Sequence, residues 1–416
     1  MRRDVSMAKE INVIKRGQQN FTLIGKAKLG QYSFKIDEQS KKSAYIYSQA
    51  NLTLKTKEGE ISASVMGGYN PEKDNVIYAF SKGDKDNKGQ SFTVSWEDRF
   101  DKEIIETVAD MKLFKAGVSK KEDGSIEYVK FLHPYDFISH LEQHMVDGEV
   151  YVVRGELQYQ EYNGEMQIKK NITSVTLAKE EIANDPETHE AKFSTTILTD
   201  SNFLGRPNKE TMTVPVNAYI VDFFNKYNKQ EIVRIVNGKE KNGLTMPVPK
   251  SFDFKIAKDM ETTKKLLKYL KPKRGAVTEI VMEGIFSKSQ GELKGEELTI
   301  DDLDDDIKFM VEVGAYTLQE ALGKVNFVYG EKTPEKMLLT RPAIKKIEGK
   351  DGSSTLAVNY TPDKYNEEDL VIENILKVNN AKFKSNEEDE EEDIFNEEET
   401  EDDDDLDLDD DWSDIF

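Results

Sequence analysis

One pattern occurs twice in this chain of 416 residues, and it restricts the fold more than any other feature. A segment of helical spacing is followed by a short turn, a strand with an internal glycine, a tight turn and a second strand. The glycine is Gly155 in the first copy and Gly284 in the second, and seven matched positions share an offset of 129 residues. A glycine inside a strand marks a bend or a bulge. The repeat therefore predicts two related domains in tandem, with a period too long for a solenoid.

The segments around each glycine indicate the type of domain. The helix predicted over 134–146 starts at Pro134, and Phe137, Ile138 and Leu141 recur on one of its faces. Several short strands precede it, and Asn163–Gly164 predicts a closing hairpin after it. Short strands, one helix before a bent strand and a final hairpin are the pattern of an OB-fold. We expect a mainly β protein with a minor helical part, built from tandem OB-fold barrels and a disordered acidic tail.

Composition shifts give the predicted boundaries. The boundary between the two copies should lie near residues 184–187. The expected parts are a basic N-terminal arm over 1–19, a first OB-fold domain over 20–183, a second OB-like domain with a helical insert over 188–349, a linker over 350–384, and a disordered acidic tail over 385–416.

The net charge of −22 comes almost entirely from the tail. Residues 385–416 contain twenty Asp and Glu and no Lys or Arg. Since the whole chain has 80 acidic and 58 basic residues, residues 1–384 have 60 acidic residues against those 58, a net charge of about −2. The body can therefore carry a positive groove on a mixed surface, although the overall charge suggests a protein that avoids nucleic acid.

Two absences narrow the class of protein. There is no cysteine, which excludes disulfides and Cys-ligated zinc and fits a reducing, cytoplasmic location. No apolar run is long enough for a transmembrane helix, and the start lacks the apolar segment of a signal peptide, so we expect no membrane association.

Two stretches resemble a known family. Residues 150–157 with the following Tyr162–Asn163–Gly164–Glu165 turn resemble strands four and five of single-stranded-DNA-binding OB domains. The tail end resembles the acidic, Phe-ended C-terminal peptide of bacterial and phage single-stranded-DNA-binding proteins, although the usual Ile-Pro-Phe order is absent and Trp412 is extra. The two-domain layout with inserts is more similar to a phage replication protein. The resemblance implies replication or recombination partners that dock on Asp409, Asp410, Asp411, Trp412, Asp414, Ile415 and Phe416.

Single-stranded DNA requires cations along its phosphates and flat rings for its bases. The candidate residues in the first domain are Tyr32, Phe34, Tyr45, Tyr47, Trp96, Arg154, Tyr159, Tyr162, Lys169 and Lys170. Those in the second are Tyr219, Lys264, Lys268, Lys271, Lys273 and Arg274. About half of the aromatics can instead be barrel core. The lysine run can equally be the wet face of a helix, and Arg154 can form a surface salt bridge.

The sequence gives little support for an enzyme. His140 and His144 are four residues apart but lack an HExxH motif, and the acids over 301–306 fit a solvated loop better than a Mg²⁺ site. We therefore expect no catalytic residues, no metal and no cofactor.

The hypothesis from the sequence is a sequence-independent single-stranded-DNA-binding protein of replication, recombination and repair, with a tail that competes for the positive groove and recruits partners. One alternative is an acidic interaction or DNA-mimic protein whose OB-like domains bind protein. A less favoured one is a Mg²⁺-dependent nuclease that uses the acids over 301–306.

Overall fold

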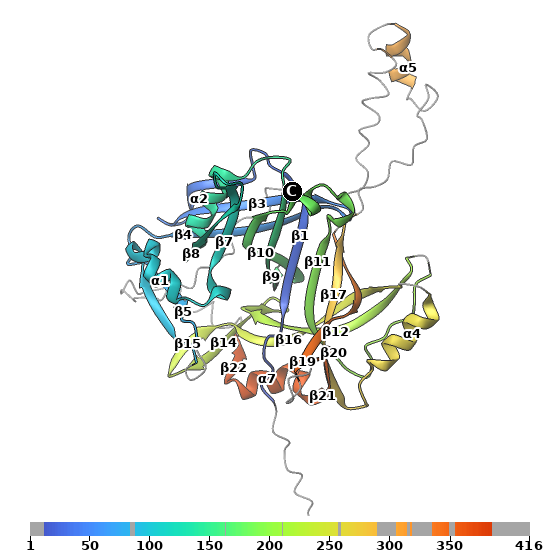
Figure 1. Cartoon of the computed structure of the whole chain (residues 1–416). Helices are drawn as coiled ribbons and strands as arrows, with labels where there is room; N and C mark the ends of the chain where they lie inside the picture. Colours follow the sequence, from blue (N-terminus) through green and yellow to red (C-terminus); the bar gives the residue numbers. More distant parts are fainter. Residues whose placement is uncertain are drawn as a thin grey trace, which may run out of the picture.

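The structure is a computed structural model that describes residues 12–83, 88–162, 164–209, 211–256, 259–288, 305–313, 317, 335–348 and 354–384. Across these ranges the chain is mainly β, as predicted, with two barrels joined through a shared sheet (Figure 1).

Barrel 1 is formed by five strands in the order β1–β3–β4–β10–β9, and β9 pairs back onto β1. Only β4 and β10 run parallel, and the helix α2 lies between β4 and β9 in the chain. This is the topology of an OB-fold. The elements are β1 (Gln19–Lys28), β3 (Ile46–Thr56), β4 (Gly59–Tyr69), α2 (Pro134–His144), β9 (Val150–Tyr162) and β10 (Glu165–Leu177).

Barrel 2 repeats the same order with β11–β12–β16–β18–β17, and β17 pairs back onto β11. Its parallel pair is β16 and β18, and its helix α4 again precedes the fourth strand. The prediction of tandem OB-folds is therefore confirmed. The elements are β11 (Ala191–Thr199), β12 (Thr213–Phe224), β16 (Leu244–Lys255), α4 (Met260–Tyr269), β17 (Ala276–Ser287) and β18 (Lys336–Pro342).

The repeated glycines hold the same place in both barrels. Gly155 lies opposite Phe21 of β1, and Gly284 lies opposite Phe193 of β11. A Cβ at Gly155 would come within 1.9 Å of the Asn171 carbonyl oxygen, and one at Gly284 would come within 2.2 Å of the Phe193 ring. Both positions thus require glycine because a backbone and a phenylalanine ring approach closely.

The barrels meet where β1 pairs with β11 in antiparallel register. The central pair is Phe21 opposite Phe193, which are the two residues that lie opposite the repeated glycines. Because equivalent residues face each other across the junction, the two barrels are related locally by a pseudo-two-fold axis. One hydrophobic cluster runs through both barrels and includes both phenylalanines, each almost fully buried.

The remaining elements are additions to this frame. Barrel 1 carries β2 (Phe34–Gln39), and an insertion before α2 made of β5 (Val76–Phe80), β6 (Ser91–Ser95), η1 (Glu97–Phe100), α1 (Lys102–Thr107), η2 (Asp110–Lys112), β7 (Phe114–Lys120) and β8 (Ile126–Phe131). Between the barrels lie α3 (Glu180–Ala183) and η3 (Pro186–Thr188). Barrel 2 adds β13 (Lys226–Tyr227), β14 (Gln230–Val236), β15 (Lys239–Asn242) and α5 (Asp305–Glu312). After β18 come β19 (Ile344–Glu348), β20 (Ser354–Val358), β21 (Tyr360–Asn366), η5 (Glu367–Leu370), α7 (Ile372–Val378) and β22 (Ala381–Phe383).

The predicted linker over 350–384 is wrong for residues 354–384. β21 pairs with β17 of barrel 2, and β22 pairs with β14. Leu370, Ile375 and Leu376 of this segment are buried, and further apolar side chains, such as Tyr360 and Phe383, pack against the core while partly exposed. Backbone pairing at the sheet edges also holds the segment, and composition does not reveal such pairing.

The basic arm predicted over 1–19 also needs correction where it is described, from residue 12. Asn12 donates from its backbone and its side-chain nitrogen to the two carboxylate oxygens of Asp369, and Ile14 is buried beside Val221. Gln18 donates its backbone N–H to Thr196 Oγ1. Residues 12–18 thus form a strap across barrel 2 and the C-terminal segment.

Candidate nucleic-acid interface

The outer face of β3 and β4 in barrel 1 is polar and almost free of charge. Alternate β3 residues such as Leu52 and Leu54 are buried in the core, so Asn51 and Thr53 point outward. On β4, Ser62 faces outward and shares a 2.9 Å hydrogen bond with Thr53. In OB-folds, strands two and three and the loop before them form the usual oligonucleotide face. Here those strands are β3 and β4.

The turn between β1 and β2 presents one exposed ring beside this face. Ser33 accepts a 2.8 Å hydrogen bond from the Asn51 backbone, and Leu29 N–H donates to Asp147 at 2.7 Å. These bonds fix the turn that carries Tyr32, whose side chain is 72% exposed. Phe34, which follows, is instead half-buried and packs against the core. Of the two predicted rings, Tyr32 alone is presented freely to solvent.

Tyr45, just before β3, and Tyr47, near its start, are half-buried, and burial raises the pKa of both phenols. A Cβ at Gly68 would come within 2.8 Å of the Tyr45 ring, so this ring packs on the strand backbone. These tyrosines are part of the wall of barrel 1 more than they are open platforms.

Trp96 is enclosed by its neighbours. The Tyr69 ring lies 5.0 Å away and the His133 ring 4.9 Å away, while the Arg99 guanidinium lies 4.3 Å from the indole centroid. Arg99 in turn pairs with Asp136 of α2 at 3.0 Å. The cluster fastens the insertion to the N-terminus of α2, so the prediction of Trp96 as a stacking platform is not supported by its surroundings. Burial, together with the positive Arg99, lowers the pKa of His133 to about 4.

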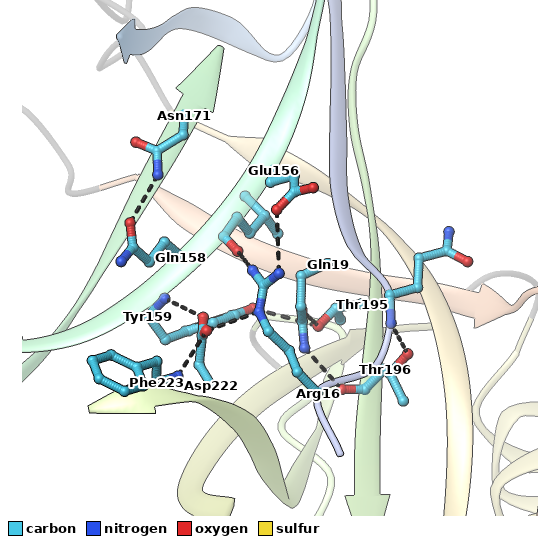
Figure 2. A network of polar contacts seen from close by, with 12 residues as sticks. Arg16, Gln19, Glu156, Gln158, Tyr159, Asn171, Thr195, Thr196, Asp222 and Phe223 are labelled. Atoms are coloured by element: carbon cyan, nitrogen blue, oxygen red, sulfur yellow. Dashed lines mark hydrogen bonds and ion pairs between the residues drawn. The ribbon is translucent and has the colours of Figure 1, made fainter. Parts of the chain in front are cut away.

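The predicted hairpin residues lie at the barrel junction. The inner face of the β9–β10 hairpin extends past barrel 1 and covers barrel 2, as Figure 2 shows for Tyr159 beside Thr195 and Asp222. Tyr159 is fully buried, and burial raises the pKa of its phenol. Lys170 pairs with Glu335 of barrel 2 at 2.6 Å. Both predictions of DNA contact are corrected, because the hairpin needs this face to pack on the second barrel.

The rest of the hairpin is closer to solvent. Tyr162 and Lys169 are half-buried and Arg154 is exposed on the outer side of β9. The tip is held because Glu161 accepts hydrogen bonds of 2.6 Å from the backbones of Asn228 and Lys229, at a turn of barrel 2 where both have positive φ. DNA contact by Arg154, Tyr162 and Lys169 stays a prediction.

Two cations at the junction were missed from the sequence. Arg16 donates to Asp222 at 2.8 Å, to the Leu157 carbonyl at 2.7 Å and to Glu156 at 3.2 Å, so it connects the strap to both barrels (Figure 2). Lys250 lies on β16 near the Tyr159 and Phe252 rings, and burial lowers the pKa of its amine. The only sign of this in the sequence is that Lys250 occupies an inward-facing position of its strand.

In barrel 2, Tyr219 packs against a small core cluster that includes Ile14 and Leu370, and burial raises its pKa. It is therefore not an open ring. Lys264, Lys268 and Lys271, by contrast, are exposed along α4 and the residues that follow it, as is Arg274. Lys273 pairs with Asp363 at 2.9 Å.

Other predicted features lie outside the described residues. These are the whole tail tip from Asp409 to Phe416 and the acids over 301–304.

Within the described ranges, no three His, Asp or Glu side chains are placed to share a metal ion. The His140 and His144 rings stack at 4.2 Å. Among the described helices, none has the length and apolar character needed to cross a membrane.

Comparison with known proteins adds little. No family model matches the chain, and no curated protein sequence does. Two solved structures of a single-stranded DNA binding protein from Thermus aquaticus are similar at low level. A deletion and point variant has 9% identity and a TM-score of 0.27, covering 66% of this chain and 89% of its own. The wild type has 11% identity and a TM-score of 0.26, covering 66% and 88%. At these scores the likeness carries no argument beyond the topology described above.

Proposed function

We propose that this chain is a single-stranded-DNA-binding protein that acts without sequence preference, in replication or recombination and without catalysis. The observation that carries the proposal is Tyr32, an exposed ring fixed beside the polar outer face of β3 and β4. Unpaired bases can stack on such a ring, while a duplex keeps its bases inside.

Lack of sequence preference follows from the chemistry of this face. Hydroxyl and amide groups such as Thr53 and Asn51 can each donate and accept, so they do not select one base edge. Stacking is tolerant as well, because every base has a π face. Lys55 on β3 and Arg154 on β9, which are both exposed, would contact phosphates.

The test is an anisotropy titration of labelled oligothymidine. Tyr32→Ala should weaken binding by about 1–3 kcal/mol, the usual contribution of one stacked base. Tyr128→Ala is the matched control, because Tyr128 is also exposed, at 66%, but lies on β8 of the insertion. Equal affinities for the two variants would contradict the assigned face. No binding by the wild type at low salt would favour the alternative, an acidic protein that binds other proteins.

We further propose that the acidic tail regulates this binding. Covalent attachment would keep the twenty negative charges of residues 385–416 near the barrels at about millimolar effective concentration, where they would compete with DNA for cations. DNA would displace the tail and make Trp412, Ile415 and Phe416 available to replication partners. Ending the chain after Lys384 should tighten DNA binding at low salt and abolish partner recruitment. Unchanged DNA affinity at low salt would rule out the competition.

A further inference from the structure

The helix of barrel 2 carries a surface that the barrel itself does not require. Lys264, Lys268 and Lys271 are exposed and, among the described residues, none of them has an acidic partner. Lysines three or four residues apart on one helix repel each other. Among the lysines of this helix, only Lys265 forms an ion pair within the helix, with Glu261 at 3.1 Å. For Lys268, in the last turn of α4, the helix dipole offsets this repulsion, so helix stability by itself does not explain the row of lysines.

The corresponding helix of barrel 1 shows that the charges are not structural. α2 closes its barrel in the same way, with Phe137, Ile138 and Leu141 at the positions of Leu266, Leu267 and Leu270. Yet α2, Pro134–His144, contains no lysine or arginine. The same packing role is thus filled by a helix without lysine or arginine.

A pair of rings lies beside these lysines, and one of the two, Tyr269, is exposed. Tyr269, at the end of α4, is 63% exposed, and its hydroxyl lies 3.1 Å from the hydroxyl of Tyr360 on β21. The two ring centroids are 5.8 Å apart. Each phenol thus orients the other, and the Tyr269 ring stays open to solvent.

Cations without partners around an open aromatic ring fit one ligand class, a polyanion with flat groups to stack. We infer that Lys264, Lys268, Lys271 and Tyr269 form a second binding surface for single-stranded DNA, here called the α4 face. This rests on the proposed function and extends it. Figure 1 shows α4 on the side of barrel 2 remote from β3 and β4, so the α4 face is separate from the Tyr32 face. A short strand occupies one face, and a long strand reaches both.

The experiment compares two oligothymidines, one of about 12 nucleotides, which a single OB domain can hold, and one several times longer. The α4 variant is K264Q/K268Q/K271Q. The control is K112Q/K120Q/K121Q, which removes three exposed charges from the barrel 1 insertion. Its net charge therefore equals that of the α4 variant. Circular dichroism confirms that both variants fold.

For the long strand, the α4 variant should bind more weakly than the control, and the slope of log affinity against log salt should fall in magnitude by about 2, since each lost contact removes about 0.7. Tyr269→Ala should weaken binding of the long strand about fivefold or more. Equal salt slopes for the α4 variant and the control would overturn the inference while leaving the proposed function intact. Failure of the wild type to bind either strand would overturn both.

Discussion

Asp222 is the buried charge on which the junction of the two barrels depends. Its carboxylate accepts from Arg16 at 2.8 Å, from the Tyr159 backbone at 2.8 Å and from the Phe223 backbone at 2.9 Å. Its side chain is only 3% exposed, whereas that of Arg16 is 32% exposed. Replacing Asp222 by alanine therefore removes an acceptor from three donors, of which the Tyr159 N–H is the most deeply enclosed.

The expected cost can be worked out contact by contact. A buried N–H left without a partner costs about 1–3 kcal/mol. Arg16 is partly hydrated and keeps both Glu156 and the Leu157 carbonyl, so the lost ion pair contributes only about 1 kcal/mol. Phe223 is exposed, and its N–H can bind water. Asp222→Ala should therefore lower the free energy of unfolding by about 3 kcal/mol.

Urea unfolding followed by circular dichroism measures this difference, and Asp222→Asn serves as the control. Asparagine can keep an oxygen for the Tyr159 N–H, while its amide nitrogen replaces the oxygen that accepts from Arg16 and from the solvent-accessible Phe223 N–H, so it should cost about 1 kcal/mol. If the asparagine variant is as unstable as the alanine variant, then charge, and not the Tyr159 hydrogen bond, dominates. If alanine changes stability by less than about 0.5 kcal/mol, the junction does not depend on Asp222 at all.

Two further changes test other parts of the fold. Gly155→Ala should destabilise the protein by about 2 kcal/mol or more in urea unfolding, because the neighbouring backbone must shift, whereas Gly30→Ala, which meets nothing within 4 Å, should stay within about 0.5 kcal/mol. Lowering the pH from 7 to 5 should cost the wild type about 2 kcal/mol more than His133→Asn, because unfolded histidine takes up a proton below about 6.5 while His133 in the fold does so only near 4. Equal pH profiles would mean that His133 is not buried as described; asparagine is chosen because it can still cap α2.

The parts of the fold that sequence predicts well are those fixed by local rules. The α2 face of Phe137, Ile138 and Leu141 and the bends at Gly155 and Gly284 follow from spacing and from the conformational freedom of glycine. Matching the two copies was enough to predict tandem OB-folds, because each barrel needs the same sequence of elements to close.

The candidate site was harder to predict because burial depends on contacts between distant segments. Tyr159 lies two residues after Leu157, on the same inner face of β9, but its position near a hairpin tip suggested that its ring would be exposed. The tip is in fact held by barrel 2, through the bonds from Asn228 and Lys229 to Glu161. Nothing local to a hairpin reveals that another domain lies against it.

The pseudo-two-fold junction has a consequence for how a strand of DNA can be held. Phe21 faces Phe193, so equivalent faces of the two barrels are related by a half-turn. A nucleic-acid strand has a direction, and a half-turn reverses it, so one straight strand cannot lie in the same way on both equivalent faces. A protein with this junction must either loop the strand back or use different surfaces on its two barrels. The contrast between α4, with its exposed lysines, and α2, with none, favours the second arrangement. The symmetry of the fold thus gives a reason why its binding surfaces should differ.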